Sequence, residues 1–231
     1  MSLILQIETA TTVCSVALAK DGNVIAVQEV NERNVHAEKI TVFIEDVCKE
    51  ANIKLAEINA VAVSKGPGSY TGLRIGVSTA KGICFAADKP LIAVDTLTTM
   101  ASGALNWRDQ FNDDALLCPM IDARRMEVYT AIYDVHGNQL RPIAAEIIDE
   151  NSFADLPKDR QLVIFGDGAL KCKEVLEQMH HVIYLPGFLN SATQLTTLAA
   201  EKFASADFED VAYFEPYYLK EFVAGKKPLA S

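Results

Sequence analysis

Hydrophobic and polar positions along the chain fall into two successive blocks that share one plan. Each block opens with three mainly apolar runs, at 3–7, 13–19 and 24–30 in the first and at 116–121, 127–133 and 139–148 in the second. In each block the second and third runs are joined by a turn of the kind that closes β-hairpins, Asp21-Gly22-Asn23 or His136-Gly137-Asn138. The pattern therefore predicts two antiparallel three-stranded meanders.

After each meander, helical and strand-like patterns alternate. In the first block helices are expected at 36–51, 71–87 and 96–105, the last capped by Thr96, and strands at 60–64 and 91–94. In the second block helices are expected at 152–156, from Gly168 through Met179 and at 193–206, and strands at 162–165 and 182–185. This is an α/β fold with two βββαβαβα-type halves, 1–105 and 106–231. It is the duplicated ribonuclease-H-like plan that actin-like ATPases and sugar kinases share.

A glycine-rich segment lies between the strand at 60–64 and the helix that follows it. Four glycines fall in Gly66-Pro67-Gly68-Ser69-Tyr70-Thr71-Gly72-Leu73-Arg74-Ile75-Gly76. Such a loop is costly in backbone entropy, so it indicates a sharp turn or a close approach. Two interpretations stay open: amides at the helix start could cradle a phosphate, or the loop could let the helix pack closely. The residues singled out are Gly66, Gly68, Ser69, Gly72 and Arg74.

The overall charge and composition narrow the classes of function. The formal net charge is −10, which disfavours unaided binding to nucleic acid. No apolar run is long enough to span a membrane, and the chain opens as a strand without a basic leader, so a cytoplasmic protein is expected. The five cysteines are scattered without a Cys-x-x-Cys pair, which favours free thiols over a zinc site.

The two meanders resemble nucleotide-binding hairpins in position but not in composition. Actin-like ATPases carry Asp-x-Gly-Thr after the first strand, whereas this chain has Glu8-Thr9-Ala10-Thr11 and, in the second block, Asp122-Ala123-Arg124-Arg125. A side chain in place of the glycine hinders close approach of a phosphate. A degenerate nucleotide site is therefore expected at Glu8, Thr9, Asp122, Gly166 and Gly168. The sequence slightly favours a turn or capping role for Glu8 over a role in binding a metal-bound water.

The sequence gives little indication of a catalytic metal site or a catalytic nucleophile. The position four residues after His36 is Ile40, so no histidine pair lies on one helix face. Ser69 lies in the glycine loop but lacks the Gly-x-Ser-x-Gly pattern of a nucleophile elbow. No catalytic residue and no metal ligand are assigned.

The helix predicted at 71–87 is apolar or small on two sides, and the helix at 36–51 carries extra apolar residues, Val42 and Phe43. A helix that is apolar on two sides is buried on both, which favours a partner protein against this pair of helices. The alternative is that both helices are simply core. The predicted interface residues are His36, Ile40, Phe43, Val47, Leu73, Val77, Ala80 and Cys84.

Several of these segments resemble the bacterial TsaB (YeaZ) family. The glycine loop at 66–76 looks like the family signature, and with Ile121-Asp122-Ala123-Arg124-Arg125-Met126-Glu127-Val128-Tyr129 it is specific. Weaker matches are Ile7-Glu8-Thr9-Ala10, His36-Ala37-Glu38 and Glu215-Pro216-Tyr217-Tyr218-Leu219-Lys220. The chain departs from the family at Glu8, where aspartate is commoner, and at Lys220, where arginine is commoner.

The resemblance implies an accessory subunit in making threonylcarbamoyladenosine on tRNA. Members bind a catalytic subunit of the same fold, TsaD, through the first two helices, and self-associate through that surface as a homodimer when alone. TsaD carries a His-x-x-x-His metal site, and in this chain Ile40 stands where the second histidine would be. An ATPase, TsaE, completes the machinery. No intrinsic cofactor is implied: ATP or ADP is expected only in the complex, tRNA contact is indirect, and no membrane is involved.

Two other classes of function stay open. One is an autonomous nucleotide-dependent kinase or ATPase of the same fold, against which the glycine-free hairpins weigh. The other is a glycopeptidase-like metallopeptidase, against which the missing histidine pair weighs. Calorimetry with ATP and magnesium would distinguish the first, and metal content after purification the second.

Overall fold

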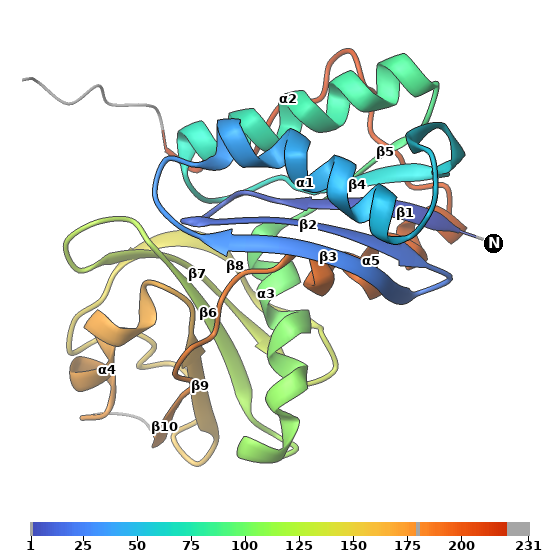
Figure 1. Ribbon diagram of the computed structural model, residues 1–231. Helices are drawn as coiled ribbons and strands as arrows, with labels where there is room; N and C mark the ends of the chain where they lie inside the picture. The colour runs from blue at the N-terminus through green and yellow to red at the C-terminus, as the bar shows by residue number, and fades with distance from the viewer. Residues whose placement is uncertain (1, 179–180, 221–231) are drawn as a thin grey trace, which may run out of the picture.

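The strands form two mixed five-stranded sheets with the same internal order (Figure 1). This computed structural model describes residues 2–178 and 181–220. The first sheet has the order β3-β2-β1-β4-β5 and the second β8-β7-β6-β9-β10. The bounds are Leu3–Glu8 (β1), Val13–Lys20 (β2), Asn23–Asn31 (β3), Ala60–Ser64 (β4), Leu91–Val94 (β5), Leu116–Asp122 (β6), Glu127–Asp134 (β7), Gln139–Ile147 (β8), Gln161–Phe165 (β9) and His181–Tyr184 (β10). The predicted duplicated α/β fold is confirmed.

Two helices cover the upper face of the first sheet in Figure 1. They are α1 (His36–Glu50) and α2 (Tyr70–Ala87), which lie side by side. Each buries one apolar stripe, led by Ile40 and Val47 on α1 and by Val77 on α2, in a single core with the inward side chains of β1, β2 and β4. Burial of apolar surface of this kind is the main stabilising contribution to the fold.

Two further helices each pack on the sheet of the opposite half. Helix α3 (Thr96–Ala104) follows β5 but buries its apolar residues against β6, β7 and β9 of the second sheet. Helix α5 (Thr196–Ala204) follows the last strand but packs on the lower face of the first sheet, where Ala199 contacts the core around Ile92. The Thr196 hydroxyl also donates to the Gln6 side-chain oxygen of β1 (3.0 Å). These crossings join the two sheets into one body.

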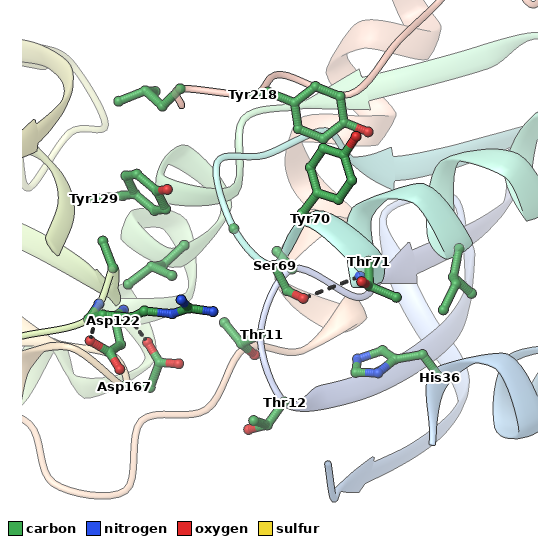
Figure 2. A pocket seen from close by; sticks show the side chains of 18 of the residues that line it. Thr11, Thr12, His36, Ser69, Tyr70, Thr71, Asp122, Tyr129, Asp167 and Tyr218 are labelled. Atoms are coloured by element: carbon green, nitrogen blue, oxygen red, sulfur yellow. Dashed lines mark hydrogen bonds between the residues drawn. The ribbon is translucent and has the colours of Figure 1, made fainter. Parts of the chain in front are cut away.

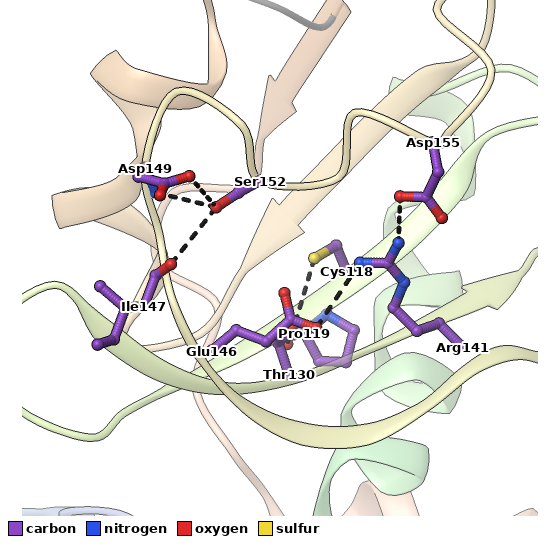
Figure 3. Close-up of polar contacts among 9 residues, drawn as sticks. All are labelled: Cys118, Pro119, Thr130, Arg141, Glu146, Ile147, Asp149, Ser152 and Asp155. Atoms are coloured by element: carbon purple, nitrogen blue, oxygen red, sulfur yellow. Dashed lines mark hydrogen bonds and ion pairs between the residues drawn. The ribbon is translucent and has the colours of Figure 1, made fainter.

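Some predicted boundaries change. The predicted helix at 152–156 is a series of turns, because the Ser152 hydroxyl accepts the Asp149 amide (2.9 Å) and holds the chain in a loop (Figure 3). Arg141 of β8 fixes this loop by pairing with Asp155 and stacking over Phe153. Helix α4 spans Ala169–Leu176, and position 179 of its predicted extent lies outside the described residues.

Other boundaries shift by a residue or more. The N-cap residue of α3 is Asp95 and not the predicted Thr96. The predicted helix at 193–206 is a short 3₁₀ turn, Ala192–Leu195, followed by α5. The segment 105–110 between the two sheets is also 3₁₀. No helix in the described part of the chain has the length and apolar character needed to cross a bilayer.

The last described residues form a segment that we call the strap, residues 207–220. It runs antiparallel beside α2: the Glu209 amide donates to the Leu91 carbonyl (2.9 Å), and the Tyr217 amide donates to the Lys65 carbonyl (2.7 Å). Lys81 of α2 donates to the Phe214 carbonyl (2.8 Å) midway. The strap ends beside the second sheet, where Lys220 pairs with Glu127.

Candidate functional site

A cleft of about 790 Å³ lies between the two halves of the molecule (Figure 2). Its first wall is built from the β1–β2 turn, the loop before α1 and the N-terminus of α2. Its second wall is built from the β6–β7 turn and the loop before α4, and the end of the strap closes one side. These are the elements in which the sequence predicts a degenerate nucleotide site and the glycine loop.

Glu8, at the end of β1, lies beneath the cleft and not in it. Its side chain is fully buried, and its carboxylate accepts the Ala10 amide (2.6 Å). Burial raises the pKa of Glu8 from 4.5 to about 7, and the Ala10 amide opposes that rise only in part. Glu8 therefore closes the β1–β2 turn, the role that the sequence favoured.

The glycine loop is packed against this same turn. The Ser69 amide donates to the Ala10 carbonyl (2.7 Å), and the Ser69 hydroxyl caps α2 by accepting the Gly72 amide (3.2 Å). A methyl group at Gly68 would overlap Ala10, and one at Gly72 would overlap the Thr9 carbonyl oxygen. Of the two interpretations of the glycines, the structure supports close packing of α2 on the turn.

The five residues of the predicted nucleotide site do not form one pocket. Only Asp122 lines the cleft. Glu8 and Thr9 are buried, Gly166 takes a φ of +100° in the turn after β9, and Gly168 packs against the backbone of β6. The same loop instead brings Asp167 to the floor of the cleft.

The second wall is held by a chain of hydrogen bonds. The Asp167 carboxylate accepts the Asp122 amide, and the Asp122 carboxylate accepts the Arg124 amide, both at 2.9 Å. Lys171 of α4 pairs with Asp122. Desolvation raises the pKa of Asp167 above its ordinary value. The turn is thus fixed by carboxylates that are already engaged within the protein.

A cluster of aromatic side chains stands at the strap side of the cleft. The rings of Tyr70 and Tyr218 are 4.8 Å apart, and the Arg74 guanidinium lies 4.2 Å from the centre of the Tyr70 ring. Arg74 Nε also donates to the Tyr218 hydroxyl (3.1 Å). Tyr129 of β7 faces this cluster from the other wall (Figure 2). Arg74, singled out with the glycines, therefore joins α2 to the strap.

The predicted interface residues are mostly core, which corrects the expectation that they form an exposed patch. Seven of the eight are buried within one copy, and Phe43 is half-buried: the seven are His36, Ile40, Val47, Leu73, Val77, Ala80 and Cys84. The stripe that they form faces the first sheet. His36 is part of this packing, since its Nε2 donates to the Val13 carbonyl (3.1 Å).

The outward face of the same two helices is exposed and carries few charges on α2. Phe85 is 86% exposed and Val42 is 47% exposed. The exposed residues of these helices also include small ones: Ala37, Thr41, Thr71, Ser78, Gly82 and Ala86. We call this set, with Phe85 and Val42, the outer helix face. Small side chains let a neighbouring helix approach closely.

Comparison with known proteins decides the family. The family model of TsaD, tRNA N6-adenosine threonylcarbamoyltransferase, matches residues 23–226. The tRNA threonylcarbamoyladenosine biosynthesis protein TsaB of Escherichia coli is 36% identical, and the match covers 97% of each chain. The chain belongs to the TsaB family. The solved structure of YeaZ from Pseudomonas aeruginosa superposes with a TM-score of 0.80 at 26% identity, covering 95% of this TsaB chain and 100% of that one.

A more distant likeness shows the fold alone. Component A of the (R)-2-hydroxyglutaryl-CoA dehydratase of Acidaminococcus fermentans superposes with a TM-score of 0.54 at 11% identity, over 88% of this TsaB chain and all of that one. Within residues 2–178 and 181–220, no three His, Cys, Asp or Glu side chains gather as a metal site would require.

Sequence reasoning missed several residues of the cleft. Neither Asp167, which lies between Gly166 and Gly168, nor Arg33, which lines the cleft before α1, was predicted as a site residue. The signal for Tyr129 was present, because it ends the Asp-Ala-Arg-Arg block at 122–129. No local pattern indicates that the strap returns to the cleft.

Proposed function

We propose that this TsaB chain is a non-catalytic scaffold subunit in the synthesis of threonylcarbamoyladenosine on tRNA. Its principal partner is a TsaD-type catalytic subunit, which it binds and holds in an active conformation. The family assignment supports the pathway, because the E. coli relative is named for this biosynthesis and the matching family model is that of the transferase.

The observation that carries the docking role is the outer helix face. Phe85 is almost wholly exposed beside Gly82, at which a methyl group would meet no atom within 4 Å. An exposed aromatic ring within a surface of small side chains is typical of a helix-packing interface. A partner that has this same fold can offer its own helix pair, so that four helices pack together. A stable interface of that kind buries roughly 1,600 Å² in total.

The cleft supports the non-catalytic part of the proposal. Where an actin-like ATPase needs a glycine turn that is open to phosphate, the β1–β2 turn has Ala10, and its carbonyl accepts the Ser69 amide of α2. On the opposite wall, Asp122 is engaged by Lys171 and by the Arg124 amide. With Glu8 buried beneath the first hairpin and Asp122 engaged on the second, neither hairpin presents a free carboxylate to Mg²⁺.

The remaining partners follow from the same arrangement. The outer helix face, uncovered in a single copy, is proposed to form a homodimer when the catalytic subunit is absent. A TsaE-type ATPase completes the complex, and ATP or ADP binds only there. We place the complex in the cytoplasm, with tRNA held mainly by the catalytic subunit and with no membrane partner.

Reconstitution tests this function. The purified chain is mixed with the TsaD and TsaE homologues of one bacterium, tRNA, ATP and the threonylcarbamoyl donor, and modified adenosine is counted by mass spectrometry of tRNA digests. We expect modification only when this chain and the catalytic subunit are both present. Modification at the full rate without this chain would overturn the proposal, as would turnover of ATP by this chain alone.

A further inference from the structure

The cleft combines hydroxyl groups on one wall with aromatic and basic groups on the other. Thr11, Thr12 and Ser69 line the first wall, and Tyr129 lines the second (Figure 2). Arg124 also lines the second wall. The volume, about 790 Å³, lies in the range of small-molecule and nucleotide sites. None of the packing described above fills this space.

Two arginines in the cleft have no acidic partner among residues 2–178 and 181–220. Lys220 pairs with Glu127 and Lys171 pairs with Asp122, so these cations are largely neutralised. Arg33 and Arg124 also line the cleft, and no ion pair or hydrogen bond of either guanidinium is found among the described residues. A pair of uncompensated guanidinium groups in a cleft attracts anions, and phosphate is the anion that arginine binds best.

The backbone directs one of two adjacent arginines into the cleft. Arg124 and Arg125 both have positive φ, +75° and +51°, in the β6–β7 turn. The Asp122 carboxylate and the Glu127 amide fix this turn through hydrogen bonds to Arg124 of 2.9 and 3.1 Å. Arg124 lines the cleft and Arg125 does not. A non-glycine turn of this kind costs conformational energy, and these hydrogen bonds hold it in place.

The aromatic groups offer stacking surfaces on both sides. Tyr129 is half-buried, and its hydroxyl has no hydrogen-bond partner in the described part of the chain. Across the cleft, Tyr218 is held by Arg74. Aromatic rings beside arginines are the usual means of binding unpaired nucleobases together with their phosphates.

We propose that this cleft binds a short single-stranded RNA segment, with a base stacked on Tyr129 and phosphates on Arg33 and Arg124. The choice of RNA rests on the proposed function in tRNA modification. A free nucleoside triphosphate fits less well, because the β1–β2 turn has Ala10 in place of the glycine of a phosphate-binding hairpin, and the Ala10 carbonyl already accepts the Ser69 amide. The net charge of −10 repels nucleic acid elsewhere on the molecule and so confines binding to the cleft.

Fluorescence anisotropy with the full chain tests this site. The probe is a fluorescein-labelled single-stranded RNA about eight nucleotides long, titrated at several salt concentrations. We expect saturable binding that weakens with salt, with a slope of about −0.7 for each phosphate contacted. Arg124→Ala should weaken binding roughly tenfold and reduce the slope by about 0.7, whereas Arg125→Ala, in the same turn but outside the cleft, should stay within about twofold.

A second pair of variants separates stacking from charge. Tyr129→Leu should weaken binding roughly tenfold, whereas Tyr129→Phe, which keeps the ring, should bind as the parent does. Equal effects of Arg124→Ala and Arg125→Ala, absence of saturable binding at low salt, or full displacement of the RNA by stoichiometric ATP would each overturn the proposal.

The catalytic subunit provides the separate check on the proposed function. Arg124→Ala should bind the TsaD homologue as the parent does, because the cleft residue lies outside the outer helix face. If the parent chain binds RNA in the cleft but no TsaD homologue, the docking role fails and the RNA site stands. If it binds the TsaD homologue but no RNA, the RNA site fails and the docking role stands.

Discussion

Gly72 of α2 lies directly against the Thr9 carbonyl of the β1–β2 turn, so closely that even a methyl group at this position would overlap the oxygen. Gly68, in the loop before α2, lies equally close to Ala10, and Gly76, one turn after Gly72, lies against the Thr9 side chain. The glycine loop of this TsaB chain therefore holds a helix against a hairpin, and the turn that binds phosphate in related folds becomes part of the core.

Replacement of Gly72 by alanine should destabilise the protein. The methyl group must displace backbone and not a flexible side chain, so we expect a loss of about 2 kcal/mol in the free energy of unfolding. The matched control is Gly82→Ala in the same helix, where the space is open; there alanine should add about 0.5–1 kcal/mol. Urea unfolding of the two variants measures both effects. Equal stabilisation by both changes would show that α2 is not pressed against the turn.

The buried Glu8 carboxyl should make stability depend on pH. Its pKa in the folded protein, about 7, lies above the 4.5 of an exposed glutamate, so the native state holds this proton more tightly than the unfolded chain does. Stability from Glu8 is therefore full below about pH 4.5 and is lost as the pH rises to about 7, by about 3 kcal/mol in total.

Glu8→Gln isolates this effect, because the side-chain oxygen can still accept the Ala10 amide but the group does not ionise. The unfolding free energy is measured by urea titration at about pH 5 and about pH 8 in parent and variant, and we expect the parent to lose about 2.5 kcal/mol more than the variant. A variant that loses as much stability as the parent over this range would mean that Glu8 does not titrate there.

The strap should depend on Lys81. The ammonium donates to the carbonyls of Ala212 (3.2 Å) and Phe214 (2.8 Å), and Lys81→Met removes both donors while keeping the apolar stem. We expect a loss of about 1–3 kcal/mol in stability and faster hydrogen exchange at the Tyr217 amide, which bonds Lys65. Unchanged exchange at Tyr217 would contradict a role for Lys81 in holding the strap.

Much of the fold can be predicted from the sequence, because the spacing of apolar residues and the residue types in turns depend only on nearby positions. The strands at 60–64 and 91–94 and the helix that begins near 70 are found within a residue of the prediction, and the two hairpins follow their glycine turns. The region at 149–156 fails because side-chain hydrogen bonds of Asp149 and Ser152 compete with a helix that has little apolar surface to bury.

The interface residues could not be read in the same way. The sequence shows that α2 is apolar on more than one side, but not which side meets the sheet. Leu73 and Val77 are both buried, and the strap, from over a hundred residues later, supplies Val211 and Phe214 to the core that contains Val77. The segment that covers this side of α2 is therefore distant in the sequence. Leu73→Asp or Val77→Asp would place a charge in the core and destabilise the fold, so neither variant could test partner binding.

The binding surface is better tested at exposed positions. Phe85→Glu and Val42→Glu place a charge on the outer helix face without touching the core, so both variants should fold as the parent does. Leu170→Glu is the matched control: it replaces an apolar side chain that is 63% exposed by a charged one on α4, outside the outer helix face.

The decisive measurement is the affinity of the full chain for the TsaD homologue of the same bacterium, by isothermal titration calorimetry with complex mass checked by light scattering. We expect a one-to-one complex that Phe85→Glu weakens at least about tenfold and Leu170→Glu leaves unchanged. A complex that forms equally well with Phe85→Glu and Val42→Glu, both correctly folded, would contradict docking through the outer helix face.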